Sequence, residues 1–544
     1  MPSPSLPTRV PLSLRFLFPR ASFVGRADVF VSDVKENSDD CTFGDTFAAL
    51  PGMKVDGANF ALAAVRKGAT SVLTQRPLAD VPVPQCVVPN VRLAYAQLCA
   101  ALHGDPSHEL RTVGVTGTNG KTTVTWLVRS ILAAAGHRCG LTGTIEYSDG
   151  IQTERSSLTT PTARTLNDWL GRMVTARTKH VAMEISSHSL DQDRVAGTEL
   201  DAAIITNITQ DHFDYHGDFD NYVAAKARIA ELCKPDGCVI LNADDDRVKS
   251  LYAPGGCRIR ENSADRSQHS RILTNSATSR ILTNSATSEA ENNDTLTART
   301  LVTFGLSPDT DVSAAILEET LDGTRFQLRL RRETLEVTTP LVGRHNVLNC
   351  LAAAAAAAHL GVSPDEIAVG IESLEAVPGR LERIDGGQPF SAFVDYAHTD
   401  DALQRCVEAL KRLTTGRVIC VFGAGGDRDR TKRPKLGRAA SGADVAVVTS
   451  DNPRSEDPAK IIKEIVKGIP TGRSVHVEID RAAAIRWAVQ NARPNDCILV
   501  AGKGHETEQI LGDRRIPFDD REQLRQAIEE TTVSSQRRTP VSVG

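Results

Sequence analysis

The chain has 544 residues, of which 40% are hydrophobic and 24% charged, which is the composition of an ordinary globular protein. At roughly 150 residues per domain, this length predicts three domains. The formal net charge of -5 argues against nucleic acid as a partner. No uncharged apolar run reaches the roughly 18 residues of a membrane-spanning helix, so we expect no stable membrane insertion. The alanine-rich stretch 351–362 predicts a packed helix instead.

The first thirty residues differ in composition from the rest of the chain. Four arginines precede the first acidic residue, Asp28. A transit or secretory peptide has this basic character, but Arg15 interrupts the apolar patch and no small-residue cleavage site follows a sustained apolar run. We therefore expect residues 1–30 to form a disordered extension.

The eleven cysteines lie singly between Cys41 and Cys497 and form no CxxC pair. A zinc ribbon or a disulfide framework would need paired or regularly spaced cysteines. The pattern favours free thiols in a reducing compartment, so we expect a cytoplasmic protein.

Short β-branched runs alternate with longer helical stretches, which predicts an α/β fold with parallel sheets. Breaks at 104–106 and 378–379 divide the chain into predicted domains at 31–108, 109–377 and 378–544. Strands are predicted at 112–116, 180–185, 202–207 and 238–242 in the central domain, and at 391–396, 417–422, 443–449 and 497–501 in the C-terminal domain.

A polar, low-complexity segment near 261–294 interrupts the central domain. The nonapeptide SRILTNSAT occurs at 270–278 and again at 279–287. Two copies are fewer than a solenoid needs, and the segment carries little apolar surface that could pack. We expect a surface insertion without chemistry of its own.

The first central strand leads into a glycine-rich turn. Its sequence is Gly117-Thr118-Asn119-Gly120-Lys121-Thr122-Thr123, and a helix is predicted over 124–135. N–H groups at a helix start bind phosphate, the Lys121 ammonium can reach terminal phosphates, and the Thr122 hydroxyl can bind Mg²⁺. Although Val115 stands at the first glycine of the strict GxxxxGK[ST] pattern, the turn predicts a nucleoside triphosphate site.

Metal-ligating side chains follow two further central strands. Glu184 lies at the end of one strand and His212 follows the other. Because the carboxyl ends of parallel strands meet at one edge of a sheet, we expect both beside the phosphate turn. A carboxylate in this position suits Mg²⁺, which prefers oxygen ligands and water. The HExxH helix of zinc proteases is absent from the sequence.

Charged or glycine-rich segments follow four strands of the C-terminal domain, at 395–398, 423–429, 451–454 and 502–506. Their common edge predicts a second polar site facing the first. Arg428 and Arg454 suit a carboxylate, and Glu506 suits an ammonium group. A substrate that carries both groups is an amino acid.

These motifs resemble the Mur ligase family, and most closely its diaminopimelate-adding branch. The resemblance runs from about Gly44 to Glu522 in the family's order. It implies an N-terminal UDP-substrate domain, a central P-loop ATPase domain with a parallel sheet, and a C-terminal Rossmann-like domain. The motifs that carry it are GTNGKTT, TTP, MEISSHSLDQDRV, TNITQDHFDYHGD, YVAAKAR, PGRLERI, VDYAHT, GAGGDRDRTKRP and DNPR.

The resemblance implies ATP-driven amide synthesis in peptidoglycan assembly, with Mg²⁺ as the metal and a monomer as the expected state. The γ-phosphate would pass to the D-glutamate side-chain carboxylate of UDP-N-acetylmuramoyl-L-alanyl-D-glutamate. An amine of meso-2,6-diaminopimelate would then displace it from the acyl phosphate. The residues agree with this reaction, because phosphoryl transfer is catalysed mainly by placement and electrostatic stabilisation.

By the same resemblance, Lys121, Lys226 and His212 serve catalysis. Lys226 matches the lysine that the family carbamylates, whereas without the family it would be interpreted as an exposed helix lysine. The implied metal ligands are Thr122, Glu184 and His212. The implied ATP contacts are Gly117, Thr118, Asn119, Gly120, Lys121, Thr122, Thr123 and Asn242, with His398 in the interdomain region by the nucleotide.

Two further sets of contacts follow from the resemblance. Amino-acid choice would rest on Arg454, which would clamp the distal carboxylate that lysine lacks; losing such a buried pair costs roughly 2–5 kcal/mol. The UDP-substrate contacts would be Ser38, Met53, Lys54, Val55, Thr159, Thr160, Ser186, Gln192 and Arg194. The diaminopimelate contacts would be Arg428, Asp451, Asn452, Pro453, Arg454, Gly502 and Glu506.

Three residues depart from the family pattern: Asp39 stands where the uridine motif has arginine, His345 replaces an aromatic residue, and Asp400 replaces a proline. The alternatives are a lysine-adding ligase of the same family, a more distant folylpolyglutamate synthase, and a catalytically silent scaffold. DNPR argues against lysine, the muramoyl-peptide contacts argue against folate, and the intact chemical residues argue against a scaffold. Because two sites must meet, we also expect domain closure.

Overall fold

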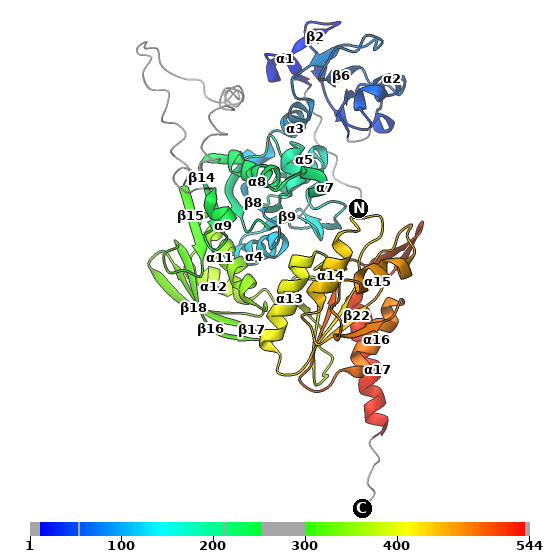
Figure 1. Ribbon diagram of the computed structural model, residues 1–544. Helices are drawn as coiled ribbons and strands as arrows, with labels where there is room; N and C mark the ends of the chain where they lie inside the picture. Colours follow the sequence, from blue (N-terminus) through cyan, green and yellow to red (C-terminus); the bar gives the residue numbers. More distant parts are fainter. Residues whose placement is uncertain (1–10, 53–54, 210–212, 252–299, 539–544) are drawn as a thin grey trace, which may run out of the picture.

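The computed structural model describes residues 11–52, 55–209, 213–251 and 300–538. Three main sheets follow one another along the chain, and we name the N-terminal, central and C-terminal domains after them (Figure 1). The predicted duplicated segment at 270–287 lies outside the described residues. Among the described residues, no helix combines the length and apolar character that crossing a bilayer would require.

The N-terminal domain holds a five-stranded sheet of order β2-β7-β6-β5-β4. Four strands are parallel and β2 pairs antiparallel with β7. The strands are β2 (Ser22–Val24), β4 (Val34–Lys35), β5 (Thr46–Ala48), β6 (Ser71–Thr74) and β7 (Gln85–Val87), and the helices are α2 (Ala61–Arg66) and α3 (Val91–Leu102).

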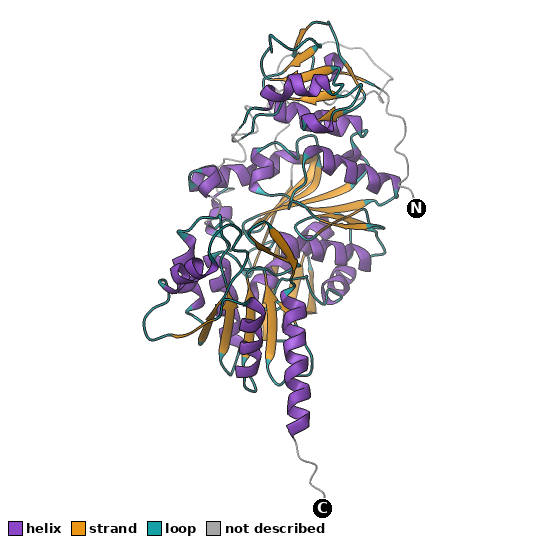
Figure 2. Ribbon diagram, turned by 90° about the vertical axis from the view of Figure 1, so that its right-hand side faces the viewer, coloured by secondary structure: helices purple, strands orange, loops and turns teal. Residues whose placement is uncertain are grey.

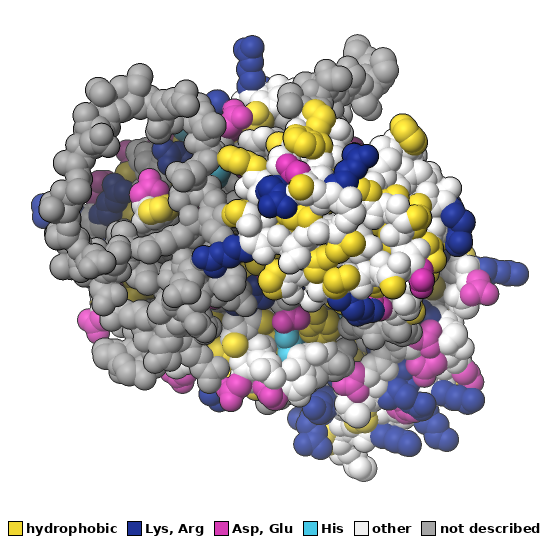
Figure 3. All heavy atoms as spheres, turned by 90° about the horizontal axis from the view of Figure 1, so that it is seen from above, with side chains coloured by type: hydrophobic (Ala, Val, Ile, Leu, Met, Phe, Trp, Pro, Cys, Tyr) yellow, Lys and Arg dark blue, Asp and Glu magenta, His cyan; other side chains and the backbone are white. Residues whose placement is uncertain are grey.

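The structure corrects the expectation of disorder for residues 11–30. Strand β1 (Leu12–Ser13) pairs with β3 (Phe30–Val31), and helix α1 (Leu14–Leu17) follows β1 directly. Leu14 is fully buried in a cluster with Val29 and Val31, which ties the segment to the domain core. Arg15, Arg20 and Arg26 are exposed outside this core, and Figure 3 shows basic and hydrophobic side chains interspersed on the N-terminal end of the molecule. Residues 1–10 lie outside the described part.

The central domain holds an eleven-stranded sheet of order β11-β10-β9-β12-β8-β13-β14-β15-β16-β17-β18. The strands from β9 to β16 are parallel neighbours, and antiparallel strands extend both ends. All four predicted central strands are confirmed. The bounds are β8 (Arg111–Thr116), β9 (Cys139–Thr142), β10 (Glu146–Ser148), β11 (Thr153–Arg155), β12 (His180–Glu184), β13 (Leu200–Ile205), β14 (Cys233–Asn242), β15 (Thr300–Gly305), β16 (Val312–Thr320), β17 (Gly323–Leu330) and β18 (Glu333–Thr339).

Helices cover both faces of this sheet, as a parallel sheet requires (Figure 2). The alanine-rich stretch forms the buried side of α11 (Arg344–His359), and the small side chains let it lie close to the sheet. With it pack α4 (Lys121–Ala134) and α12 (Pro364–Glu372). The second core contains residues of α5 (Ala163–Thr175), α6 (Ser187–Asp191), α8 (Phe219–Ala227) and α9 (Asp246–Ser250), while α7 (Phe213–His216) contacts α8.

The C-terminal domain holds a six-stranded sheet of order β19-β20-β24-β21-β22-β23, whose four predicted strands are also confirmed. Alternate strand residues enter two separate cores, one lined by α13 to α15 and the other by α16 and α17. The strands are β19 (Glu382–Arg383), β20 (Ser391–Asp395), β21 (Val418–Phe422), β22 (Val445–Val448), β23 (Ser474–Val477) and β24 (Cys497–Ala501). The helices are α13 (Asp400–Leu413), α14 (Lys432–Ala440), α15 (Pro458–Val466), α16 (Arg481–Asn491) and α17 (Asp520–Arg538), and the hairpin is β25 (Glu508–Leu511) with β26 (Arg514–Pro517).

Arg481 and Asp520 form a fully buried ion pair between α16 and the start of α17. We expect Asp520→Ala to lower the free energy of unfolding of the C-terminal domain by about 3–5 kcal/mol, because it leaves an uncompensated guanidinium in the core. Denaturant titration followed by circular dichroism measures this change. Glu336→Ala removes an exposed partner of Arg325 and serves as the control with little effect. Equal stability of the two variants would contradict the expectation.

Candidate functional site

The glycine-rich turn after β8 has the conformation that only glycine supplies at two positions. Gly117 and Gly120 have φ angles of 150° and 89°. A Cβ on Gly117 would lie 1.9 Å from Thr206 Oγ1, and one on Gly120 would lie 2.5 Å from Asn349 Oδ1. The N–H groups of Thr118 and Asn119 donate to Asn207 O and Asn207 Oδ1, both at 2.9 Å. The loop that follows β13 therefore holds the turn in place through Asn207. Helix α4 begins at Lys121, so the N-terminus of the helix lies directly at the turn.

Two lysines donate to one carbonyl of this turn. Lys121 Nζ lies 3.0 Å from Gly117 O and 3.1 Å from Thr118 O. Lys226 Nζ on α8 lies 2.7 Å from the same Gly117 O, and its side chain is only 2% exposed. The interpretation of Lys226 as an exposed helix lysine is therefore wrong. Two ammonium groups beside a helix N-terminus attract anions strongly, and we call this region, formed by Lys121, Lys226 and the start of α4, the phosphate corner.

Glu184 closes the other side of this corner. Its buried carboxylate accepts from Thr122 Oγ1 at 3.0 Å, from Thr144 Oγ1 at 2.9 Å and from the Thr144 N–H at 2.8 Å. A Cβ on Gly143 would lie 2.4 Å from Glu184 Oε1, so this glycine admits the carboxylate. The structure thus brings Lys121, Thr122 and Glu184 together, as the sequence predicted for the edge of the parallel sheet, and adds Lys226, which only the family resemblance had indicated.

The segment that contains Thr159 and Thr160 lies against Glu184. Thr160 Oγ1 donates to Glu184 O at 2.8 Å and accepts from the Ser186 N–H at 3.0 Å, while Thr159 accepts from Thr144 Oγ1 at 3.1 Å. Arg194 donates to Gln192 Oε1 at 2.6 Å and to Thr160 O at 3.3 Å. The five residues predicted to contact a muramoyl peptide therefore form one connected group beside the phosphate turn.

A cavity of about 450 Å³ lies between the central and C-terminal domains. The central domain contributes the phosphate turn, Glu184 and Asn242, whose side chain donates to Thr206 O at 2.7 Å. The C-terminal domain contributes Arg380 and the loop after β20, including His398. All the predicted ATP contacts except Gly117 therefore line a space that two domains enclose.

Two side chains of the C-terminal domain reach the phosphate turn directly. Arg380 donates to Thr122 Oγ1 at 3.1 Å, and its guanidinium lies 4.7 Å from the centroid of the Tyr396 ring. Asp401, in the first turn of α13, accepts from Asn119 Nδ2 at 3.3 Å and from Thr209 Oγ1 at 3.1 Å. The two domains are thus in polar contact across the cavity.

The predicted amino-acid contacts lie on the loops after β21, β22 and β24. Asn452 Nδ2 donates to Glu506 Oε2 at 2.9 Å, and Arg454 Nη1 donates to Gly426 O at 2.7 Å. Lys503 is fully buried, and its Nζ contacts Glu506 Oε2 at 2.9 Å. Glu506, expected to hold a substrate ammonium, therefore already faces an ammonium group of the protein itself.

The other predicted contacts of this group lie close by. A Cβ on Gly502 would lie 2.6 Å from Asp451 Oδ2, and a Cβ on Gly426 would lie 1.9 Å from Pro453 O. Arg428 is exposed on the loop after β21. Among the described residues, these amino-acid contacts do not line the 450 Å³ cavity and lie on neighbouring loops of the same sheet edge.

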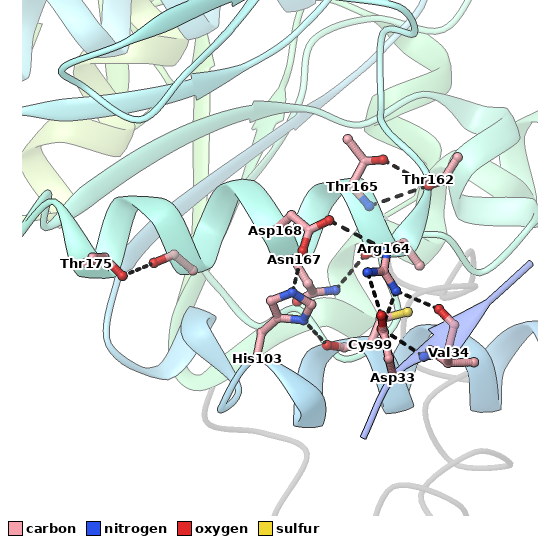
Figure 4. Close-up of polar contacts among 12 residues, drawn as sticks. Asp33, Val34, Cys99, His103, Thr162, Arg164, Thr165, Asn167, Asp168 and Thr175 are labelled. Carbon is pink, nitrogen blue, oxygen red and sulfur yellow. Dashed lines mark hydrogen bonds and ion pairs between the residues drawn. The ribbon is translucent and has the colours of Figure 1, made fainter. Parts of the chain in front are cut away.

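The N-terminal domain is joined to the central domain by a charged network around α5 (Figure 4). Arg164 contacts both carboxylate oxygens of Asp33, with Nη2 at 3.0 Å, and donates to Val34 O at 2.7 Å. His103 bridges Cys99 O and Asp168 Oδ1 at 2.7 and 2.6 Å. Burial alone would raise the pKa of Asp33, but Arg164 and Lys35 hold it well below its usual range.

The predicted uridine contacts belong to the N-terminal domain. Ser38 begins a short 3₁₀ helix and is buried, whereas Val55 is 50% exposed. Met53, Lys54 and His212 lie outside the described residues. Among the described residues, no three His, Cys, Asp or Glu side chains gather as a metal site.

The structure gives local accounts of the three departures from the family pattern. Asp39 pairs with Lys67 at 2.6 Å on the surface. Asp400 lies in the first turn of α13, where the helix dipole favours an acidic side chain. His345 lines the cavity, and burial lowers its pKa to about 4, with Arg405 and Arg412 acting in the same direction.

Comparisons with known proteins assign the chain to a family. The model of the Mur ligase middle domain matches residues 115–292 and 268–357, and that of the Mur ligase glutamate ligase domain matches residues 379–504. The chain belongs to the Mur ligase family. The UDP-N-acetylmuramoyl-L-alanyl-D-glutamate–2,6-diaminopimelate ligases of Geobacillus thermodenitrificans and Solibacter usitatus are 40% and 39% identical to it. The alignments cover 90% and 92% of this chain and 93% and 94% of those proteins.

Solved Mur ligases share the three-domain fold. A structure of a UDP-N-acetylmuramoyl-L-alanyl-D-glutamate–2,6-diaminopimelate ligase matches with a TM-score of 0.64 and 29% identity, over 96% of this chain and 100% of that one. The MurF ligase of Thermotoga maritima in complex with ADP matches with a TM-score of 0.57 over 92% of this chain and 98% of that one. At 16% identity, the second match concerns the fold alone.

Sequence reasoning missed roles for Arg380, Lys503 and Arg164 in this Mur ligase. Arg380 and Lys503 stood in segments that the motifs had singled out, PGRLERI and the loop after β24, so their position was a usable signal. Arg164 stands outside any motif, and nothing local indicated that a guanidinium on α5 would reach Asp33 of another domain.

We expect Lys121→Ala to lower the turnover of this Mur ligase by about 10²–10³-fold, because a preplaced cation at the phosphate corner is lost. A coupled assay of ADP formation measures the loss, and circular dichroism checks that the variant is folded. Lys179→Ala removes an exposed lysine of the same domain and is the matched control. Near-normal turnover of Lys121→Ala would refute the assignment of the phosphate turn.

Proposed function

We propose that this chain joins meso-2,6-diaminopimelate to UDP-N-acetylmuramoyl-L-alanyl-D-glutamate at the expense of ATP. The observation that carries the proposal is the alignment, over nine-tenths of the chain, with ligases named for this reaction, with the predicted motif residues Lys121, Glu184 and Arg454 all present. The lysine-adding alternative would leave Arg454 without a carboxylate to bind. A silent scaffold would have no need of the buried Lys226 at the phosphate turn.

The reaction divides into two steps that balance. An oxygen of the D-glutamate carboxylate attacks the γ-phosphorus of ATP, the bond from that phosphorus to the bridging oxygen breaks, and ADP leaves. The amine nitrogen then attacks the acyl carbon, the carbon–oxygen bond to phosphate breaks, and the nitrogen loses a proton. The products are the amide, ADP and phosphate.

The residues of the phosphate corner support the first step by placement and charge. Lys121 and the start of α4 bind the phosphates that ATP presents, and Arg380 reaches the same corner from the C-terminal domain. Negative charge spreads over the phosphoryl oxygens as the γ-phosphate transfers, so cations placed beforehand stabilise the transition state without reorganising. Asn242 and His398 lie around the cavity where the rest of the nucleotide would bind.

Thr122, Glu184 and His212 would hold Mg²⁺ in this proposal. Thr122 Oγ1 and Glu184 Oε2 are hard oxygen donors 3.0 Å apart, which fits an ion that keeps several water and phosphate ligands. When bound, the ion neutralises phosphate charge and fixes its geometry.

Lys226 would carry a carbamate in the active protein. Its Nζ lies 2.7 Å from Gly117 O and 4.6 Å from the centroid of the Tyr222 ring, within the phosphate corner. Carbamylation replaces the ammonium by an anion, which would turn one of the two cations at this corner into a support for the metal. Intact-mass measurement of the carbamate is the direct check.

The amino-acid substrate would bind at the loops after β21, β22 and β24. Arg454 would clamp its distal carboxylate, with Arg428 nearby on the facing loop. Glu506 would contact its ammonium group while Lys503, buried behind it, holds the carboxylate in place. The remaining contacts would come from Asp451, Asn452, Pro453 and Gly502.

The dipeptide nucleotide would bind between the N-terminal and central domains. Its uridine would meet the segment at Ser38 and Val55, with Met53 and Lys54. Its muramoyl peptide would meet Thr159, Thr160, Ser186, Gln192 and Arg194, which lie beside Glu184. We further propose a cytoplasmic monomer that binds no nucleic acid.

Phosphate release by the purified protein tests the proposed reaction. The assay contains ATP, Mg²⁺ and UDP-N-acetylmuramoyl-L-Ala-D-Glu, and compares meso-diaminopimelate, L-lysine and no amino acid. Release that depends on diaminopimelate supports the proposal. Release that depends on lysine keeps the ligase and overturns the substrate, whereas no release from folded, ATP-binding protein favours the scaffold.

Arg454→Ala should raise the KM for diaminopimelate by about 30-fold or more and leave the KM for ATP within about twofold. The reason is that a carboxylate clamp contributes roughly 2 kcal/mol or more to binding and does not touch the nucleotide. Steady-state kinetics with each substrate varied in turn separates the two constants. Equal losses for both substrates would contradict the clamp.

A further inference from the structure

We propose that Glu456 is a positioning residue that sets the guanidinium of Arg454 and thereby the selection of the amino-acid substrate. The inference deepens the proposed function and rests on it. Glu456 lies just after the DNPR segment, in the loop between β22 and α15, and no predicted contact includes it.

Arg454 and Arg428 lie on different loops, after β22 and β21, so the position of these loops relative to each other decides whether the two guanidinium groups face the same substrate. The backbones of the two loops are already in contact: the Gly426 N–H donates to Asn452 O at 2.9 Å, and Arg454 Nη1 donates to Gly426 O at 2.7 Å. A Cβ on Gly425 would lie 2.9 Å from Arg454 Nη1. The direction of the Arg454 side chain therefore depends on where the neighbouring loop sits.

Glu456 joins these two loops through one carboxylate. Its Oε1 accepts from the Asp427 N–H at 2.7 Å, on the β21 loop, and from Arg433 Nη2 at 2.7 Å. Its Oε2 accepts from Arg433 Nη1 at 3.0 Å. Asp427 in turn accepts from Ser455 Oγ at 2.6 Å and from the Ser455 N–H at 3.2 Å, so the connection runs in both directions.

The buried side chain of Arg433 holds the Glu456 carboxylate in place. Its side chain is 1% exposed at the start of α14, and it holds Glu456 with two parallel hydrogen bonds. Such a two-armed contact fixes direction as well as distance. The Arg433 hydrogen bonds lower the pKa of Glu456 to about 2, so the carboxylate stays ionised at neutral pH.

The backbone of Arg454 also needs this support. Its φ angle is 51°, in the left-handed region that a non-glycine residue adopts only when its surroundings hold it there. The Arg454 N–H donates to Ile510 O at 3.1 Å on one side, and the Glu456 N–H donates to Pro453 O at 3.0 Å on the other. The backbone of Glu456 thus closes the turn that contains Arg454, and its carboxylate holds the β21 loop that the Arg454 side chain contacts.

The chain offers a matched control for Glu456. Glu464 on α15 also accepts from Arg433, through Nη1 at 2.8 Å, and also pairs with the exposed Arg430. It has the same charge and the same buried partner as Glu456, but it contacts arginine side chains, whereas Glu456 also accepts from the N–H of Asp427. Removing its charge therefore tests the ion pairs while the hydrogen bond from the Asp427 N–H to Glu456 stays in place.

The experiment compares Glu456→Gln and Glu464→Gln in the full-length protein by steady-state kinetics. We expect Glu456→Gln to raise the KM for meso-diaminopimelate about tenfold or more, because a small misplacement of a clamp is costly. The KM values for ATP and for the dipeptide nucleotide, and kcat at saturation, should change less than about twofold. The ratio of diaminopimelate to lysine turnover should fall, and Glu464→Gln should leave all five quantities near the wild-type values.

Three results would overturn the inference: an unchanged KM for diaminopimelate in Glu456→Gln, an equal rise in all three KM values, or an equal effect of Glu464→Gln. If Glu456→Gln does not fold, Ser455→Ala removes one hydrogen bond to Asp427 and should shift the same KM in the same direction; no shift there counts against the inference. Failure of the proposed function itself shows separately, as a wild-type protein that does not respond to diaminopimelate.

Discussion

Two ammonium groups share the carbonyl oxygen of Gly117, and the rest of the site depends on this concentration of positive charge. Lys121 comes from the start of α4 and Lys226 from α8, on the far side of the phosphate turn. Like charges at one oxygen repel each other, and a negatively charged group placed between them offsets this repulsion. A bound triphosphate and a carbamate on Lys226 would each supply negative charge there, so the proposed chemistry is compatible with the charges at this site.

The C-terminal domain contributes side chains that contact the phosphate turn directly. Arg380 contacts Thr122, and Asp401 contacts the side chains of Asn119 and Thr209. Both residues lie at the edge where β20 and its neighbours end, which is also the edge that carries DNPR and the loop after β24. In the proposed function, one sheet edge would therefore bind the nucleotide at one end and the amino acid at the other.

Much of the fold and of the site could be predicted because the signals are local. β-branched runs marked the parallel strands, and the residues directly after each strand carried Lys121, Glu184 and Arg454 to the same edges. Contacts between residues far apart in the sequence could not be predicted from the sequence. Residues 11–30 resembled a basic leader because Arg15 and its neighbours are conspicuous in the sequence, whereas the burial of Leu14 against Val29 and Val31 that orders the segment is visible only in the fold.

A phosphate-binding turn could be predicted from the residues alone, because glycines at 117 and 120, a lysine at a helix start and a carboxylate at a strand end are together typical of a nucleotide site. The sequence did not indicate which charged side chains contact one another; the packed fold shows this. Lys226 turned inward to Gly117, Glu506 met Lys503, and Arg433 joined Glu456 to the β21 loop. The physical reason is that hydrogen bonds and ion pairs act over about 3 Å, and residues far apart in sequence reach that distance only after the sheets and helices have packed.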